Sequence, residues 1–280
     1  MSFFRLLGTS SCEGIPAPFC SCALCSLARR SGGKEIRRRF SVLIGNELLI
    51  DFGPDVISAF REYRLDETEV KHICFTHSHE DHFFPLDLMW RIVYDAPHLN
   101  LVGNKRVKNA YFKNAAYAHR NHVSAIRNNV DFIDAVPGRE IAFDGYTVLP
   151  IRASHGSSGE CALNYLVTVS GKWKIFIISD TGWWRSESFE SVKDVNADAA
   201  VIEISCGIHP GKDVKKMHHL GAKAAIEFID TLKAQNSLKK DAVCVASHIS
   251  HVPGTTHSDL EKYFAGSGIV PGYDGMQVDF

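Results

Sequence analysis

The heptapeptide Thr76-His77-Ser78-His79-Glu80-Asp81-His82 places three histidines and an aspartate directly after the apolar run Ile73-Cys74-Phe75. Imidazole and carboxylate groups are ligands that divalent transition metals take in proteins. So many polar groups packed this tightly cannot serve as apolar core. The pattern therefore indicates a catalytic metal centre that follows a buried strand.

Composition narrows the class of protein further. The chain has 280 residues, of which 45% are hydrophobic and 22% are charged, as in ordinary globular proteins. No apolar stretch approaches the length of a membrane span, and the first residues lack the layout of a signal peptide. We therefore expect a cytoplasmic protein that has no membrane partner.

The net charge of −1 argues against nucleic acid as a general partner. One segment, residues 104–130, is nevertheless rich in basic side chains and contains no acidic ones. Such a segment can face an anionic substrate, but a solvated helix face is the more common origin of this pattern. The basic residues are Lys105, Arg106, Lys108, Lys113, Arg120 and Arg127.

The order of apolar runs and helical patterns predicts an α/β fold. Helical periodicity appears at 86–94, 106–117, 220–234 and 258–264, and Ser170-Gly171 predicts a hairpin turn. Strands first follow one another and then alternate with helices, which favours an αββα sandwich of two mixed sheets with outer helices. No linker divides the chain, so we expect one domain over residues 1–280. The predicted strands are 41–44, 47–50, 72–75, 146–151, 163–169, 174–178, 199–204 and 242–246.

Several predicted strands end at a potential metal ligand. The strand at 72–75 leads into the histidine-rich heptapeptide, and the strand at 146–151 is followed by His155. The strands at 174–178 and 242–246 lead, after one serine each, to Asp180 and His248. Because functional groups gather at strand ends in sheet-based folds, we expect these side chains to converge.

A second cluster of ligands lies in a loop near residues 12–26. Cys20-Ser21-Cys22-Ala23-Leu24-Cys25 supplies three thiolates within six residues, and a structural zinc ion needs a closed set of four ligands. His251 is our candidate for the fourth ligand, because it lies just past His248 and can turn towards another site. Cys12 is the competing candidate.

The ordered metal ligands resemble those of the metallo-β-lactamase superfamily. The resemblance rests on HxHxDH after a strand, followed by His155, Asp180 and His248 at later strand ends. It implies two active-site metals bridged by Asp180. By this resemblance the first metal is held by His77, His79 and His155, and the second by Asp81, His82 and His248. Asp51, at the end of another strand, is either a residue that orients a ligand histidine or an ordinary turn residue.

Within that superfamily the chain resembles the phosphodiesterase family of the carbon–phosphorus lyase pathway, the PhnP family. The shared motifs are Leu7-Gly8-Thr9, the CxCxxC at 20–25, Leu49-Ile50-Asp51, Ser179-Asp180-Thr181 and Gly272-Tyr273-Asp274-Gly275-Met276. The resemblance implies a structural zinc ion at Cys20, Cys22, Cys25 and His251, and manganese or zinc in the active site. It also implies cyclic or linear phosphodiester substrates.

The same resemblance implies a general acid, which corresponds to His219 in the run Met217-His218-His219-Leu220. Histidine can protonate an alkoxide leaving group near pH 7. His218 is the alternative, and Asp81 is the other catalytic residue that we assign. Trp183-Trp184 either forms a substrate wall that stacks a base or sugar, or packs in the core.

We therefore expect a dinuclear metal-dependent phosphodiesterase whose substrate is a small nucleotide-like or ribosyl phosphate-like diester. Superfamily members also open lactones and thioesters, which is one alternative. A tRNA 3′-end endonuclease is another, although nucleic acid is disfavoured by charge. A non-enzymatic accessory protein of cofactor biosynthesis is disfavoured because the HxHxDH set is intact. Relatives often pair, so a homodimer is a further expectation.

Overall fold

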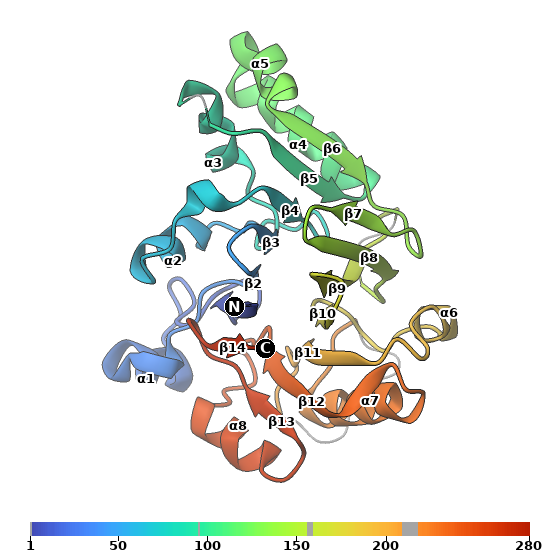
Figure 1. Cartoon of the computed structure of the whole chain (residues 1–280). Helices are drawn as coiled ribbons and strands as arrows, with labels where there is room; N and C mark the ends of the chain where they lie inside the picture. The colour runs from blue at the N-terminus through green and yellow to red at the C-terminus, as the bar shows by residue number, and fades with distance from the viewer. Residues whose placement is uncertain (1, 95, 156–158, 209–217) are drawn as a thin grey trace.

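Two seven-stranded mixed sheets lie face to face in the computed structural model, which describes residues 2–94, 96–155, 159–208 and 218–280 (Figure 1). The first sheet has the order β14 (Gln277–Asp279), β1 (Phe3–Gly8), β2 (Ser41–Ile44), β3 (Leu48–Ile50), β4 (His72–Cys74), β5 (Leu99–Gly103) and β6 (Val130–Asp134). The second has the order β13 (Ile269–Pro271), β12 (Leu238–Ser247), β11 (Ala197–Glu203), β10 (Trp173–Ile178), β9 (Leu163–Val169), β8 (Tyr146–Arg152) and β7 (Ile141–Phe143).

Helices cover the outer face of each sheet (Figure 1). The first sheet is covered by α2 (Val56–Glu62), α3 (Leu86–Met89), α4 (Lys105–Ala118) and α5 (Val123–Asn128), with the 3₁₀ turns η2 (Glu67–Glu69), η3 (Trp90–Val93) and η4 (Arg120–His122). The second is covered by α1 (Ala23–Ser31), α6 (Ser186–Glu190), α7 (Ala222–Ala234) and α8 (His257–Phe264), and η1 (Gly33–Glu35) follows α1. Within the described residues no helix is both long and apolar enough to cross a membrane.

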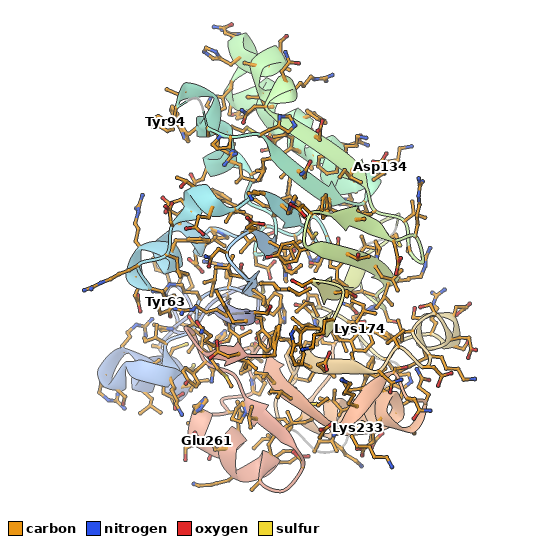
Figure 2. All side chains as sticks on the ribbon, in the orientation of Figure 1. Tyr63, Tyr94, Asp134, Lys174, Lys233 and Glu261 are labelled. Carbon is orange, nitrogen blue, oxygen red and sulfur yellow. The ribbon has the colours of Figure 1, made fainter. Side chains whose placement is uncertain are left out.

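Three apolar layers follow from this arrangement. The inner layer joins the two sheets and includes Phe4, Val42, Tyr165 and Val201, all essentially without solvent exposure. The outer layers lie between each sheet and its helices. Side chains fill the space between the sheets in Figure 2, whereas the labelled Asp134 and Glu261 project at the periphery. The expected αββα sandwich of two mixed sheets is therefore confirmed.

Parallel pairing gives both sheets a common carboxyl edge. Strands β3 to β6 are parallel to one another, as are β10 to β13. The residues that follow these strands therefore emerge at the same edge of each sheet, where ligands gather in sheet-based folds. The remaining strands are antiparallel. The predicted hairpin joins β9 to β10 through residues 170–172, and Ser170 and Gly171 both have positive φ, of 51° and 66°, as a tight hairpin turn requires.

The eight predicted strands all form, with ends that shift by a few residues. The predicted helix at 86–94 is a short α3 that continues as the 3₁₀ turn η3. Strands with a polar alternation or only three residues, such as β6 and β14, were not predicted, because periodicity is weak over so few positions.

Trp184 packs in the core, and the half-buried Trp183 packs against it. Trp184 is buried, and its Nε1 donates to Oδ1 of Asn164 at 2.7 Å. Both indoles contact the rings of Phe189 and Phe228, with centroids 4.9–5.7 Å apart. The basic segment is mainly a solvated helix face, as expected: Lys105, Arg106 and Lys113 of α4 are exposed, whereas its buried residues are Val107, Tyr111 and Ala115.

Candidate metal centre

The loops that follow strands β4, β8, β10 and β12 bring the predicted ligands together. Two groups of four side chains form, each with ligand atoms within 4.8 Å of one another, and both groups include Asp180. The first group is His77, His79, His155 and Asp180, and the second is Asp81, His82, Asp180 and His248.

The spacing within the first group fits a shared cation. Nε2 of His77 lies 2.9 Å from Nδ1 of His79 and 3.0 Å from Oδ2 of Asp180, and Nε2 of His155 lies 3.4 Å from Nδ1 of His79. A neutral imidazole has one N–H and one lone pair, and the lone pair of each ring can face a shared cation when the proton lies on the other nitrogen. Ligands at ~2.0–2.1 Å from a tetrahedral ion are themselves roughly 3.3–3.4 Å apart. The donor set therefore suits a metal ion in the centre of the group.

The second group is arranged in the same way around the other side of Asp180. Nε2 of His82 is 3.0 Å from Oδ2 of Asp81, 3.0 Å from Oδ2 of Asp180 and 3.2 Å from Nε2 of His248. Oδ1 of Asp180 is buried and has no hydrogen-bond partner among the described residues. It lies 3.2 Å from Nδ1 of His219 and 3.4 Å from Nε2 of His248. Because a buried carboxylate oxygen without a hydrogen bond is costly, this atom is a good position for a cation. Together the buried clusters fit a dinuclear metal site.

Partners outside the clusters fix the rings of the histidines. Nδ1 of His82 lies 2.6 Å from Oδ2 of Asp51, Nδ1 of His248 lies 2.7 Å from Oγ of Ser205, and Nδ1 of His155 donates to the carbonyl of His218 at 3.3 Å. In each case Nε2 is left to face the cluster, as in metal sites whose ligands are held by outer hydrogen bonds. The contact of Asp51 with His82 supports its interpretation as an orienting residue.

Burial and charge set the protonation of the clusters. Desolvation lowers the pKa of His155 to about 4 and also lowers the pKa of His79, so both imidazoles are neutral at pH 7, the form that binds metal. Burial alone would raise the pKa of Asp180 and of Asp81. The charges of neighbouring histidines, His82 among them, outweigh this and hold both pKa values well below the usual range of an aspartate.

Three of these strand-end residues occupy the left-handed region of φ. The φ angles are 61° at Asp51, 46° at Asp180 and 53° at His248. Non-glycine residues in this region cost of order 1–3 kcal/mol each and persist where the surroundings hold them. The turn directs each side chain back over the edge of its sheet, and the contacts described above are what hold it there.

His219, but not the side chain of His218, joins the site. Its Nδ1 lies 3.2 Å from Oδ1 of Asp180 and 3.2 Å from Oε1 of Glu203, whereas His218 is exposed. Burial disfavours its charged form, but the charge of Glu203 and a hydrogen bond to it outweigh this and raise the pKa of His219 to about 9. Bound cations would lower the pKa of His219, because nearby positive charge disfavours the imidazolium form. Met217 lies outside the described residues.

Glu203, which ends β11 and is buried, was not among the predicted site residues. Its Oε1 accepts from the backbone N–H of Thr181 at 2.5 Å, and its Oε2 accepts from Oγ of Ser205 at 2.5 Å. One carboxylate thereby holds the residue after Asp180, the serine that contacts His248, and His219. The available signal was an acidic residue at the end of an otherwise apolar strand.

Glu160 was also missed, and it holds the loop that carries the first two histidines. Its side chain is fully buried, and it accepts from the backbone N–H and Oγ of Ser78, both at 2.9 Å. Nδ2 of Asn104 donates to it at 3.0 Å, and Nε of Arg106 lies 3.7 Å away. Because Ser78 lies between His77 and His79, this contact fixes the separation of the two ligands.

The cysteine cluster assembles with His251, and Cys12 takes no part in it. Nδ1 of His251 lies 3.6, 3.7 and 3.5 Å from the sulfurs of Cys20, Cys22 and Cys25. Zn–S bonds of ~2.3 Å and Zn–N bonds of ~2.0 Å at a tetrahedral angle separate sulfur and nitrogen by roughly 3.5 Å. The backbone N–H of Cys25 and the ring of His251 lower the pKa of Cys22 to about 6, which favours the thiolate. These four residues can therefore hold a further metal.

Glu13 links this cluster to the loop of the catalytic candidates. Its Oε1 lies 3.6 Å from Nε2 of His251 and accepts from the backbone N–H of His251 at 3.1 Å. Its other oxygen accepts from Sγ of Cys12 at 3.2 Å, which accounts for the position of that cysteine. His251 lies three residues after His248, so the two candidate metal sites share one short loop.

Comparison with known proteins finds a matching family model and a related enzyme. A family model described as the beta-lactamase superfamily domain matches residues 46–239. Ribonuclease Z of Staphylococcus carnosus (strain TM300) is 26% identical over 195 residues, which cover 68% of this chain. The match spans only 61% of the length of that ribonuclease.

Solved structures show the same fold at low sequence identity. A diphosphatase from the PhnP family has a TM-score of 0.74 and 20% identity, over 100% of this chain and 98% of that one. Zinc-bound PqqB from Methylobacterium extorquens has a TM-score of 0.72 and 14% identity, over 99% of this chain and 100% of that one.

The cysteine cluster gives a first prediction. Cys20→Ser should release one zinc ion per chain and lower Tm, because the closed ligand set is broken. Zinc release measured with a chromogenic chelator, with Tm from calorimetry, checks this. Cys12→Ser is the matched control and should keep its zinc. Equal zinc content in both variants would show that the cluster does not bind the metal.

Glu160 gives a second prediction. Glu160→Gln removes the charged acceptor for Ser78 and should weaken metal binding about 10- to 100-fold, the usual effect of losing such an outer partner. Competitive titration with a fluorescent chelator measures this affinity. Glu190→Gln, on the exposed face of α6, is the control. Unchanged affinity in Glu160→Gln would contradict a role in holding the loop.

Proposed function

The chain belongs to the beta-lactamase superfamily, and from this premise we propose that it is a metal-dependent phosphodiesterase acting on a small cyclic or linear phosphodiester. A nucleotide-like or ribosyl phosphate-like substrate is the class that we favour. The proposal is supported by the two buried ligand groups and by an acid–carboxylate pair, His219 and Glu203, beside them.

The ligands divide between two ions in the proposed site. His77, His79 and His155 would hold one divalent ion, zinc or manganese, and Asp81, His82 and His248 would hold the other. Asp180 would bridge the two, because each of its oxygens faces histidine nitrogens: Oδ2 is 3.0 Å from His77, and Oδ1 is 3.4 Å from His248. When bound, two such ions would supply Lewis acidity and activate a water for attack on phosphorus.

The pair of His219 and Glu203 is the observation that carries the choice of substrate class. Nδ1 of His219 faces the carboxylate, so Nε2 is the atom that can donate a proton. The charge of Glu203 favours the imidazolium form and raises the pKa of His219. An alkoxide that leaves phosphorus needs such a proton, whereas opening a lactone or thioester needs it less. A donor held beside the ligand groups therefore favours phosphodiester cleavage.

Each residue near the reacting group has a distinct task. Asp81, buried beside His82, would contribute negative charge that holds the second ion. Ser205 keeps His248 in the orientation that presents Nε2, and it is itself held by Glu203. The protein thus orients the metal ligands and the proton donor through a common carboxylate.

A ribonuclease Z-like activity is the second candidate. It is favoured by the 26% identity to the ribonuclease Z of S. carnosus and by the exposed basic residues of α4. RNA binding that weakens steeply with salt would support this candidate, because phosphate contacts release counterions. A binding or biosynthetic accessory role is disfavoured, since both ligand groups are complete.

Leaving-group dependence gives the third prediction. With a diester that expels an alkoxide, such as a 2′,3′-cyclic nucleotide, His219→Asn should lower kcat about 10²- to 10⁴-fold. With bis(p-nitrophenyl) phosphate the loss should be much smaller, because p-nitrophenolate leaves without a proton. Steady-state assays of the manganese-loaded wild type and variant measure kcat with both substrates. The metal content of the variant should equal that of the wild type.

Two results would contradict the proposal in different ways. His218→Asn is the matched control and should retain activity, so equal losses in both variants would remove His219 as the proton donor. Precursor tRNA, a diphosphate ester and a lactone complete the substrate panel. Absence of turnover of any phosphodiester, with turnover of the lactone, would overturn the substrate class.

A further inference from the structure

Two sequence motifs that supply none of the predicted metal ligands lie against each other in the fold. Residues 7–9 span the end of β1, and residues 272–276 follow β13. The backbone N–H of Gly275 donates to the carbonyl of Leu6 in β1 at 2.7 Å, which places the second motif along the first. The two motifs therefore need a role other than binding an ion directly.

The hydroxyl of Thr9 joins a buried cation to a carboxylate. Nη1 of Arg37 donates to Oγ1 of Thr9 at 2.8 Å, and the hydroxyl in turn donates its own proton to Oδ1 of Asp274 at 2.7 Å. The other oxygen, Oδ2 of Asp274, accepts from the backbone N–H of Arg38 at 2.6 Å. Arg37 is 3% exposed, and the side chain of Asp274 is 6% exposed. Charges this deeply buried persist only where hydrogen bonds satisfy them, so each group fixes the orientation of the next.

The guanidinium of Arg37 also connects the network to the second sheet. Nη1 donates to the carbonyl of Gly272 at 2.7 Å, and Nη2 donates to Nδ1 of His257 in α8 at 2.8 Å. Burial, together with the charge of Arg37, lowers the pKa of His257 to about 4, so the neutral ring accepts at Nδ1. The end of β1, the second motif and α8 thus share one buried cation.

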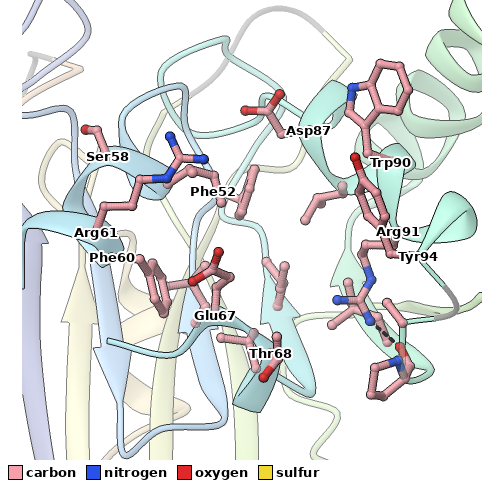
Figure 3. A pocket seen from close by; sticks show the side chains of 18 of the residues that line it. Phe52, Ser58, Phe60, Arg61, Glu67, Thr68, Asp87, Trp90, Arg91 and Tyr94 are labelled. Carbon is pink, nitrogen blue, oxygen red and sulfur yellow. Dashed lines mark hydrogen bonds between the residues drawn. The ribbon is translucent and has the colours of Figure 1, made fainter. Parts of the chain in front are cut away.

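Arg38 extends the network to the first sheet. Its Nε donates to Oγ of Ser58 in α2 at 3.2 Å, and its Nη1 lies 3.6 Å from Oδ2 of Asp274. Ser58 stands at one edge of the groove between α2 and α3, which Figure 3 shows. The carboxylate of Asp274 is therefore held from both halves of the sandwich.

The backbone of residues 9–11 holds the residue that follows His248. The N–H of Ile249 donates to the carbonyl of Thr9 at 2.8 Å, and the carbonyl of Ile249 accepts from the N–H of Ser11 at 3.2 Å. His248 itself has a φ of 53°, a conformation that persists only where the neighbouring structure holds it. Both polar backbone groups of Ile249 are fixed, and this keeps the ring of His248 turned towards the ligand cluster.

We propose that Asp274 is a positioning residue for the second active-site ion. It orients Thr9 through the hydroxyl, Thr9 fixes Ile249 through the backbone, and His248 then presents Nε2 to the cluster. Asp274 acts through these hydrogen bonds and not by contact with the ion. The inference rests on the proposed two-ion arrangement, but it does not depend on the identity of the substrate.

The two ligand groups are then held by separate carboxylates. Glu160 fixes the loop that carries His77 and His79 of the first group, whereas Asp274 acts on His248 of the second. Loss of either carboxylate should weaken one ion and spare the other. A general loss of stability would weaken both ions, so this selectivity separates positioning from structural support.

Site-resolved manganese affinity tests the proposal. Crystals of the full-length protein are equilibrated with graded manganese, and anomalous scattering gives the occupancy of each site. In Asp274→Asn the amide group faces one of two hydrogen-bond donors, so the second ion should bind about 10- to 100-fold more weakly while the first is unchanged. Glu160→Gln should show the opposite selectivity. Asp279→Asn, at an exposed residue of β14, is the matched control and should behave as the wild type.

Substitutions at Thr9 separate the hydrogen bond from packing. Thr9→Val keeps the volume of the side chain but removes the hydroxyl, whereas Thr9→Ser keeps the hydroxyl and leaves a small cavity. The proposal predicts that Thr9→Val loses the second ion selectively and that Thr9→Ser retains it. If Asp274→Asn does not fold, this pair decides the question.

The contrary outcomes are distinct. Wild-type occupancy of the second site in Asp274→Asn and Thr9→Val, or equal losses at both sites, would overturn the positioning role and leave the proposed function intact. A wild type that binds no second ion would overturn the positioning role together with the two-ion arrangement. Filled sites without turnover of any diester would contradict the proposed function alone.

Discussion

The carboxylate of Asp180 is the group around which the candidate site is arranged. Five histidines from four loops have a ring nitrogen within 4.0 Å of it, at distances from 3.0 to 3.7 Å. Such a buried carboxylate is tolerable only if positive charge faces it. Without a metal, the histidines provide that positive charge only when they are protonated. Divalent ions provide it while the histidines remain neutral ligands. The positive φ of Asp180 aims the side chain into this position, and Glu203 holds the following residue.

The cysteine cluster and the active-site candidates form one connected structure. The loop after β12 carries His248 towards the active-site clusters and His251 towards the cysteines. Glu13 accepts hydrogen bonds from this loop, and the backbone N–H of Ile249 donates to Thr9 at 2.8 Å. A metal at the cysteines would therefore restrain the segment that positions His248. This explains why the two ligand sets belong together in one fold.

Sequence patterns revealed the ligands and suggested Asp51 as an orienting residue, but they did not reveal Glu203 or Glu160. The residues at the ends of buried strands could be predicted, because parallel strands deliver their carboxyl ends to one edge. Glu203 is the last residue of such a strand, but no sequence motif with a characteristic spacing connects it to His219. Glu160 meets Ser78 across 82 residues of sequence, and such a contact leaves no local pattern. Strands β1, β6 and β14, which were not predicted, illustrate the same limit. Pairing with neighbouring strands determines whether such segments form strands more than their intrinsic propensity does.

Anomalous scattering from crystals of the metal-loaded protein tests the central claim most directly. Data recorded on both sides of the zinc and manganese absorption edges locate and identify each ion. The account predicts two peaks that share Asp180 as a ligand, and a zinc peak among Cys20, Cys22, Cys25 and His251. A zinc peak at the cysteines alone, with His77, His79 and His248 free of metal, would contradict a dinuclear catalytic centre.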